Sequence, residues 1–224
     1  MLVDTIGSVD DLIELKQKEI DSLAHISFLE YKKITFKEQT ARLASFSKDI
    51  ICGTTPSTKD CSLWNGDVPF ITVDAMANRI FTTTSTRTIT KKAYINSNRN
   101  VHKDFIMVSC IGTVGVVSLA SKDSQTNQQI NSINPIDKFK YFLFWSLKEK
   151  KEELQLLSKS GSATPNVNKE TFSKILIKTP DDISLRDFNK IAFPLFSKIL
   201  VIQNEIDCLN KQRNLLLKKY FCSE

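Results

Sequence analysis

Residues 184–224 read SLRDFNKIAFPLFSKILVIQNEIDCLNKQRNLLLKKYFCSE, and this stretch decides the fold. Ser184 followed three positions later by Asp187 is a capping-box pattern, so we expect a helix to begin at Leu185. Pro194 predicts either a kink in this helix or its true start. Apolar residues recur at alternating spacings of four and three, with Arg213 as the polar interruption: Phe188, Ala192, Leu195, Ile199, Ile202, Ile206, Leu209, Leu216 and Tyr220. A seam this long predicts that another helix packs along it.

The first 33 residues predict a second helix of the same kind. Ser8 and Asp11 form a capping box, and the helix should run to about Lys33. Its seam carries Lys16 and Ser27 as polar interruptions among the apolar positions Ile6, Val9, Ile13, Ile20 and Leu23. Because one helix enters the middle region and the other leaves it, we expect an antiparallel coiled-coil stalk. The alternative is that both helices fold onto one globular core.

An exposed seam would also join two copies of the chain or bind a partner subunit. The residues expected in such a contact are Ile13, Ile20, Leu23, Leu195, Ile199, Ile202, Ile206, Leu209 and Leu216. A two-fold dimer would place two identical domains at opposite ends of a helical spacer and read inverted half-sites about 34 Å apart.

The sequence pattern of the region between the helices predicts an α+β domain with short strands. We therefore divide the chain into a helix at 1–33, a globular domain at 34–183 and a long helix at 184–224. Gly112 and Gly115 bracket a tight turn, and 141–157 is expected to be helical. Enrichment in β-branched and aromatic residues predicts strands at 69–73, 105–110, 114–119 and 175–177, the last ended by Thr179-Pro180.

Composition narrows the function. The 224 residues carry a net charge of +6, distributed as −3 in 1–33, +6 in 34–183 and +3 in 184–224, which suits an anionic partner. Five scattered cysteines without a CxxC pair and only two histidines argue against a metal site and favour reduced thiols. There is no signal peptide and no apolar run long enough to span a membrane, so we expect a cytoplasmic protein.

Catalytic motifs are missing from the sequence. It contains no GxxxxGK[ST], GxGxxG, GxSxG or HExxH pattern. We therefore expect no catalytic residue and no cofactor.

A basic segment without any acidic residue runs from Ala75 to Lys103. Lys and Arg neutralise phosphates, while Arg and Asn can read base edges with paired hydrogen bonds. The alternative is a solvated loop with a chance run of charge. The candidate DNA contacts in this segment are Arg79, Arg87, Lys91, Lys92, Asn98, Arg99 and Lys103.

Two loops rich in Gly, Ser and Thr, at 53–59 and 160–169, could let a backbone approach a phosphate closely. Ordinary turns that cap helices are the alternative. The candidate contacts are Thr54, Thr55, Ser57 and Lys59 in the first loop, and Ser160, Ser162, Asn166, Asn168 and Lys169 in the second.

For two further groups of residues we prefer a structural interpretation to a DNA-binding one. Trp64 and Phe70 are more typical of a core than of a base-stacking platform. Residues 127–129 (NQQ) could read adenine, but a buried polar turn is the simpler interpretation.

Taken together, these stretches resemble the specificity subunit of Type I restriction–modification systems. GTTPSTKDCSLWNGDVPFIT (53–72), and IGTVG (111–115) followed by TNQQI (126–130), resemble the opening of that family's target recognition domain, and GSATPNVNKETFSKILIKTP (161–180) resembles its close. EIDCLNKQRNLLLKKYF (205–221) resembles the long helix that follows, and TIGSVDDLIELKQKEIDSL (5–23) resembles the spacer helix. A typical member has two recognition domains, whereas this chain has one, as in a half-subunit.

The resemblance implies a non-catalytic, DNA-binding subunit. Modification subunits would supply adenine methylation, and a restriction subunit would supply ATP-driven translocation and cleavage. This chain would choose the sequence and hold the methyltransferase subunits. Two alternatives stay open from the residues: a structural coiled-coil protein whose basic surface meets an acidic protein or a membrane, and a stand-alone DNA enzyme.

Overall fold

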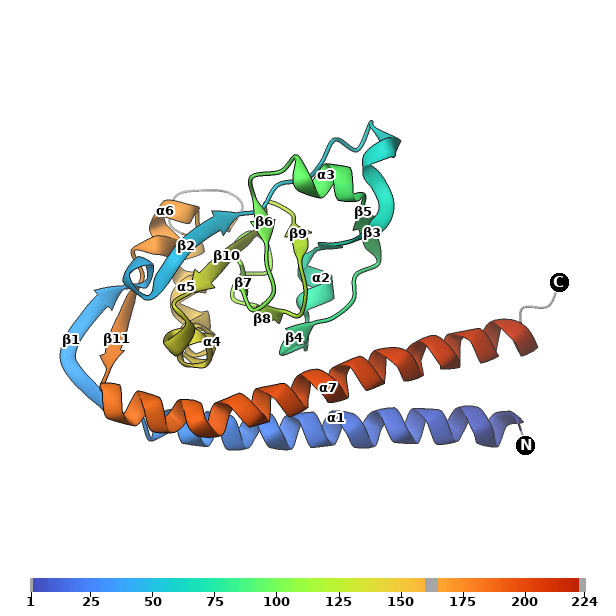
Figure 1. The fold of residues 1–224 in the computed structure, drawn as a ribbon, viewed down its shortest axis with the longest axis horizontal. Helices are drawn as coiled ribbons and strands as arrows, with labels where there is room; N and C mark the ends of the chain where they lie inside the picture. The colour runs from blue at the N-terminus through green and yellow to red at the C-terminus, as the bar shows by residue number, and fades with distance from the viewer. Residues whose placement is uncertain (1, 160–164, 222–224) are drawn as a thin grey trace.

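The computed structural model describes residues 2–159 and 165–221. Figure 1 shows a domain of short strands and helices lying along one side of two long helices, α1 (Leu2–Lys32) and α7 (Asp182–Phe221). These helices lie side by side and antiparallel, with both chain termini at the end that extends beyond the domain. The structure confirms the α+β domain and the antiparallel stalk.

Both helices begin earlier than predicted. The carboxylate of Asp181 accepts hydrogen bonds from the backbone N–H groups of Ile183 and Ser184, each at 3.0 Å, so Asp181 caps α7. The Ser184 hydroxyl instead donates to the carbonyl oxygen of Thr35 at 3.3 Å. Helix α1 starts at Leu2, which places Ser8 inside it. The capping-box patterns were therefore misread: Ser184 is already inside the first turn of α7, and Ser8 lies between one and two turns inside α1.

Helix α7 continues through Pro194, so this proline is not its start. Figure 1 shows the two parts of the helix, before and after this region, running in different directions. A change of direction agrees with the loss of one backbone hydrogen bond and the ring clash that proline introduces inside a helix.

The central part of the predicted apolar seam is buried within the chain's own fold. Ile199 and Ile202 of α7 are fully buried, and Ile20 of α1 is 3% exposed. The other seam residues expected in an intermolecular contact are Ile206, which is also buried, and the half-buried Ile13, Leu23, Leu195, Leu209 and Leu216. The chain's own helices and domain cover the central seam residues. The prediction that they form a contact between two chains is therefore wrong for Ile20, Ile199, Ile202 and Ile206.

Polar residues that interrupt the seam are paired across the stalk. The Lys16 ammonium lies 2.6 Å from the Glu205 carboxylate, and the Arg213 guanidinium lies 2.9 Å from that of Asp10. Ser27, which is fully buried, accepts a hydrogen bond from Trp145 Nε1 at 3.0 Å. These contacts tie α1 to α7 and to the domain.

The described residues of the domain form three sheets. A two-stranded ribbon of β1 (Phe36–Arg42) and β11 (Leu176–Pro180) follows α1 and precedes α7, and so connects the stalk to the domain. The five-stranded sheet has the order β2 (Ser47–Cys52), β10 (Ile130–Pro135), β7 (Ile106–Ser109), β8 (Val117–Ala120) and β4 (Phe81–Thr82). The four-stranded sheet has the order β5 (Arg87–Ile89), β3 (Trp64–Ile71), β9 (Ser124–Thr126) and β6 (Asn100–Val101). All pairs are antiparallel except β4–β8 and β3–β9.

Four predicted strands correspond to β3, β7, β8 and β11. Strand β8 begins three residues late, because Gly112 and Gly115 adopt φ values of +71° and +91° in the turn before it. Strand β11 ends at Pro180, as predicted, and this last residue pairs with Phe36 of β1. The predicted helix at 141–157 is divided at Lys150 into α4 (Lys140–Glu149) and α5 (Lys151–Lys159).

Short helices complete the domain. They are η1 (Leu43–Phe46), η2 (Cys61–Leu63), α2 (Val73–Met76), α3 (Lys91–Ile95), η3 (Asp137–Phe139) and α6 (Lys169–Ser173).

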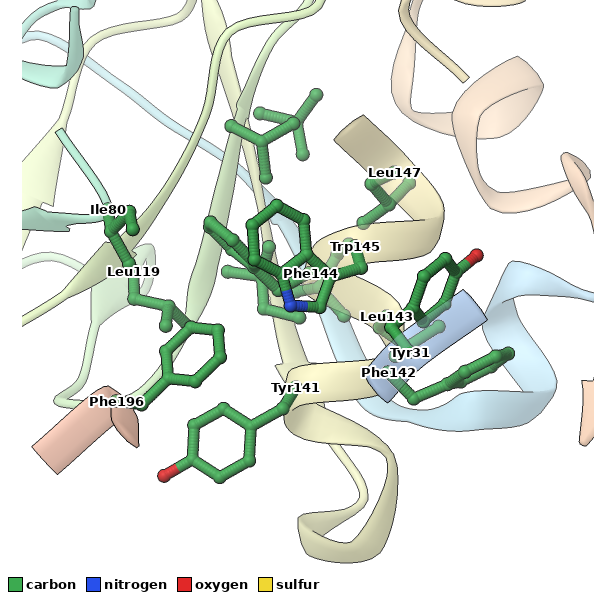
Figure 2. Close-up of a cluster of buried hydrophobic side chains, with 14 of the residues drawn as sticks. Tyr31, Ile80, Leu119, Tyr141, Phe142, Leu143, Phe144, Trp145, Leu147 and Phe196 are labelled. Atoms are coloured by element: carbon green, nitrogen blue, oxygen red, sulfur yellow. The ribbon is translucent and has the colours of Figure 1, made fainter. Parts of the chain in front are cut away.

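An aromatic cluster joins the domain to the stalk, with α4 at its centre (Figure 2). Phe196 of α7 is fully buried; its ring stacks on Tyr141 at a centroid distance of 4.3 Å and meets the edge of Phe144 at 5.3 Å. From α1, the ring of Phe28 packs on Trp145 at 5.2 Å, and Tyr31 donates a hydrogen bond to Glu149 at 2.8 Å. Phe196 lies next to the predicted seam, on the side of α7 that faces the domain.

The thiols of Cys52, Cys61, Cys110 and Cys208 are free. Burial raises the pKa of the Cys110 thiol to about 12, so this cysteine is an unreactive part of the core. In the described part of the chain, no helix is long and apolar enough to cross a membrane.

Candidate nucleic-acid interface

Two motifs separated by about seventy residues meet at one end of the domain. The backbone N–H of Gly53 donates to the carbonyl of Ile130 at 3.0 Å, and that of Thr54 donates to Thr126 at 2.9 Å. The Thr55 hydroxyl donates to the side-chain oxygen of Gln128 at 2.7 Å. The first predicted loop and the NQQ turn therefore form one surface.

Gly53 is required for this close approach. A Cβ atom on Gly53 would lie 2.1 Å from the carbonyl oxygen of Asn127 and 2.6 Å from that of Thr126. Both are backbone atoms, which cannot move aside as a flexible side chain can. In the turn itself, the Asn127 amide donates to the Gln129 side chain at 2.9 Å. The turn is polar but not buried as predicted, because Gln128 is exposed and its two neighbours are half-buried.

Helix α3 presents two lysines at the end of the domain remote from the stalk (Figure 1). The Thr90 hydroxyl caps the helix by accepting from the Ala93 N–H at 3.2 Å, and Ala93 packs in a small core with Phe70 and Ile89. With Ala93 facing that core, Lys91 and Lys92 are exposed to solvent. They have the position expected of phosphate contacts.

The same small core confirms the structural reading of Trp64 and Phe70. Phe70 is 1% exposed, and its ring meets that of Trp64 edge-on at 5.1 Å. Trp64 Nε1 donates to the Ser57 carbonyl at 3.0 Å, which anchors the predicted loop to β3. The guanidinium of Arg87 covers Trp64 at 4.0 Å from its ring centroid.

A basic groove lies on the flank of the domain and continues toward the stalk. Asn98, Arg99 and Lys169, all predicted as DNA contacts, line one pocket together with residues 49, 51 and 52 of β2. A second pocket adjoins this one, because Asp49, Ile51 and Asn98 line both. The second pocket in turn adjoins a third, with which it shares Phe105 and Asn134. The third pocket is lined by Lys103, a predicted contact, and also by Lys48 and Lys140.

Lys48 and Lys140 were missed by sequence reasoning, and acids accompany them in the groove. Lys48 lies 2.7 Å from Asp137, and Lys140 lies 3.3 Å from Asp104. The Lys48 ammonium lowers the pKa of the exposed Asp137 carboxyl. No local signal marks these lysines, because the groove is formed by strand pairing between distant segments.

Three predicted contacts have structural roles in this conformation. The guanidinium of Arg79 is paired with the Asp207 carboxylate of α7 at 2.9 and 3.3 Å, so it is not free to contact DNA. The Asn168 side chain caps α6 by accepting from the Thr171 N–H at 2.9 Å. Asn166 forms an isolated β-bridge with Ile111. Ser160 and Ser162 lie outside the described residues.

No metal centre is found in the described ranges: they contain no group of three or more His, Cys, Asp and Glu side chains placed to hold an ion. His102 lies beside Asp123 at 3.4 Å and Tyr94 at 3.4 Å on an exposed surface.

The fold and this surface together define a class: an α+β domain mounted on an antiparallel helical stalk, with basic and polar loops at the remote end. The chain belongs to the Type I restriction modification DNA specificity domain family, whose family model matches residues 37–184.

Known relatives agree with this assignment. The chain is 41% identical over 179 residues to the Type I restriction enzyme HindI specificity subunit of Haemophilus influenzae, a match that covers 78% of this chain and 39% of the relative.

Two solved structures share the fold. The S subunit of a Type I restriction-modification system from M. genitalium matches with a TM-score of 0.62 and 18% identity, covering 97% of this chain and 57% of that one. The HsdS subunit from Thermoanaerobacter tengcongensis matches with a TM-score of 0.55 and 15% identity, covering 99% and 56%. The chain thus spans between two fifths and three fifths of the length of these proteins.

Proposed function

We propose that this chain is a sequence-reading specificity subunit of a Type I restriction–modification complex, which chooses the DNA target for adenine methylation or cleavage. The observation that carries this proposal is a series of contacts around the 53–59 loop: Thr55 bonds Gln128, Ser57 bonds Trp64, and Arg87 stacks on Trp64. Helix α3, with the exposed Lys91 and Lys92, lies at the end of the domain remote from the stalk (Figure 1). Lysines neutralise phosphates, and the neighbouring Arg and Gln can address base edges. The Asn98–Arg99–Lys169 groove extends the same basic surface.

The proposed partners are double-stranded DNA, modification subunits and a restriction subunit, in the cytoplasm. The chain itself would be non-catalytic, without cofactor or metal. Its role would be to fix the position of the reading surface relative to the methyltransferase subunits, with residues 34–183 as the recognition domain and the two helices as the scaffold. The family assignment and the antiparallel stalk support this arrangement.

DNA binding should be dominated by phosphate contacts and therefore depend steeply on salt. We expect Lys91→Ala/Lys92→Ala to weaken binding to all duplexes and to reduce the slope of log K against log salt by about 2. Fluorescence anisotropy of labelled duplexes between low and moderate salt measures both quantities. A charge-matched control is Lys33→Ala/Lys190→Ala, at the connecting end of the stalk. Equal slopes for wild type and the α3 variant would place the DNA surface elsewhere.

A homodimer through the long helices would have to use the outside of the stalk, because the inner seam is occupied. Leu12, Leu15, Ile26 and Leu29 of α1 are between 40% and 64% exposed and follow a heptad spacing. Exposed apolar residues of α7 add Val201 and Leu215. We expect a dimer at micromolar concentration by light scattering, and a monomer for Leu15→Asp/Leu29→Asp. A monomeric wild type would remove the dimer from the proposal without affecting DNA reading.

A further inference from the structure

Arg87 differs from the other arginines predicted to bind DNA in how its side chain is held. Its guanidinium carbon lies 4.0 Å from the centroid of Trp64 and 5.5 Å from that of Phe70. Among the described residues, no carboxylate lies within ion-pair distance of Arg87. By contrast, the guanidinium of Arg79 is fully engaged by Asp207.

The platform beneath Arg87 is rigid. Trp64 is fixed from one side by its Nε1–H bond to the Ser57 carbonyl at 3.0 Å and from the other by the edge of Phe70. The backbone of Arg87 pairs with Phe70 in the β3–β5 ladder, and its N–H donates to the Ser85 hydroxyl at 3.3 Å. Both ends of the arginine are thereby constrained before any ligand arrives.

A stacked guanidinium keeps its N–H donors in the plane of the group, while one face is covered by the ring. This leaves a preformed fork of donors at an exposed edge of the domain. Such a fork fits two adjacent acceptors, and guanine O6 and N7 are the pair that arginine reads in the major groove. Holding the side chain in advance reduces the entropy lost on binding.

We propose that Arg87, supported by Trp64, is a specificity-determining residue that reads one guanine of the target. This inference rests on the proposed function. A phosphate is the other ligand with suitable acceptors. We favour guanine because Lys91 and Lys92 already supply exposed cations on the adjacent helix for phosphates, and a lysine cannot supply a planar fork.

The test begins with selection of duplexes from a random library by the full chain, which gives the wild-type motif. Arg87→Ala should lose the preference for guanine at one position, with about 10- to 100-fold weaker discrimination there and unchanged preferences elsewhere. Arg87→Lys, which keeps the charge, should behave like Arg87→Ala in discrimination. Lys91→Ala is the matched control and should leave the motif intact.

A chemical substitution in the DNA sharpens the test. Replacing the selected guanine by 7-deazaguanine removes the N7 acceptor, which should weaken wild-type binding by about 10-fold and leave Arg87→Ala binding unchanged. Equal loss of affinity for every sequence in Arg87→Ala, with the motif retained, would assign Arg87 to a phosphate and overturn the inference. A wild-type chain that selects no motif would instead overturn the proposed function.

Discussion

Phe196→Ala should lower the free energy of unfolding by about 3–5 kcal/mol, the loss typical of removing a large buried aromatic ring. Phe196 is fully buried, and it contacts Tyr141 and Phe144 of α4 at centroid distances of 4.3 and 5.3 Å. It also meets Phe81 of β4 at 6.2 Å. One side chain of α7 therefore packs against both a helix and a sheet strand of the domain, so its loss leaves a cavity at their junction.

The matched control is Phe193→Ala, three residues earlier on the same helix. Phe193 is 63% exposed, so this change should cost well under 1 kcal/mol. Urea denaturation, monitored by circular dichroism, gives the loss in free energy of unfolding for each variant. The two variants lose the same ring from α7, one at a buried position and one at an exposed position. Equal destabilisation by the two variants would contradict the docking of α7 on the domain.

The stalk could be predicted from sequence because its signal is local. Alternating spacings of three and four define the buried face of a helix wherever the helix is placed. Even the polar interruptions Lys16 and Arg213 were placed on the seam, although their partners Glu205 and Asp10 could not be named. Helix ends were less predictable, since Ser184 and Asp181 are both suitable caps and only the chain geometry decides between them.

Several strands escaped prediction because their buried residues are polar. Strand β10 buries Asn131 and Ser132 in the middle of a sheet, and β9 buries Ser124, Gln125 and Thr126. Asn131 is accommodated by donating to the Val167 carbonyl at 3.2 Å. The side-chain amide of Gln125 likewise donates to the Thr54 carbonyl at 2.9 Å. Apolar periodicity cannot reveal such strands, because several of their buried positions are polar.

The candidate nucleic-acid interface likewise has features that the sequence predicts and features that it does not. Composition singled out the basic segment, and Lys91, Lys92 and Arg87 within it are exposed. Charge along a chain does not show which cations are already neutralised in the fold. Arg79 pairs with Asp207, which lies 128 positions away, and no sequence pattern near Arg79 predicts that partner.

That ion pair leads to the second large effect: Asp207→Ala should destabilise the protein by about 2–4 kcal/mol. Removing one member of a buried pair typically costs about 3–5 kcal/mol, because the remaining charge is left unpaired, and partial exposure reduces this cost. The Asp207 side chain is 10% exposed and that of Arg79 is 27% exposed. The Asp207 carboxylate also accepts from the Thr83 hydroxyl, which in turn accepts from Arg79 at 2.8 Å.

The location of this pair gives it a positional role as well. Gln203, one turn before Asp207, accepts from the Phe81 N–H at 2.8 Å, so two polar side chains of α7 hold residues 79–83 of the domain. In some proteins a buried ion pair contributes more to a unique geometry than to net stability, and we infer that role for Arg79 and Asp207. We therefore expect Arg79→Met/Asp207→Leu to recover most of the stability lost in Asp207→Ala, while the orientation of the domain on the stalk becomes less restricted.

Two measurements separate these effects. Denaturant unfolding of Arg79→Met, Asp207→Leu and the double variant gives the coupling energy, which should be well above the roughly 0–1 kcal/mol expected for the exposed Lys16–Glu205 pair. Hydrogen exchange of residues 79–83 reports the attachment directly and should accelerate in the double variant despite its recovered stability. Additive single-variant losses, together with unchanged exchange at β4, would show that the ion pair does not hold the domain on α7.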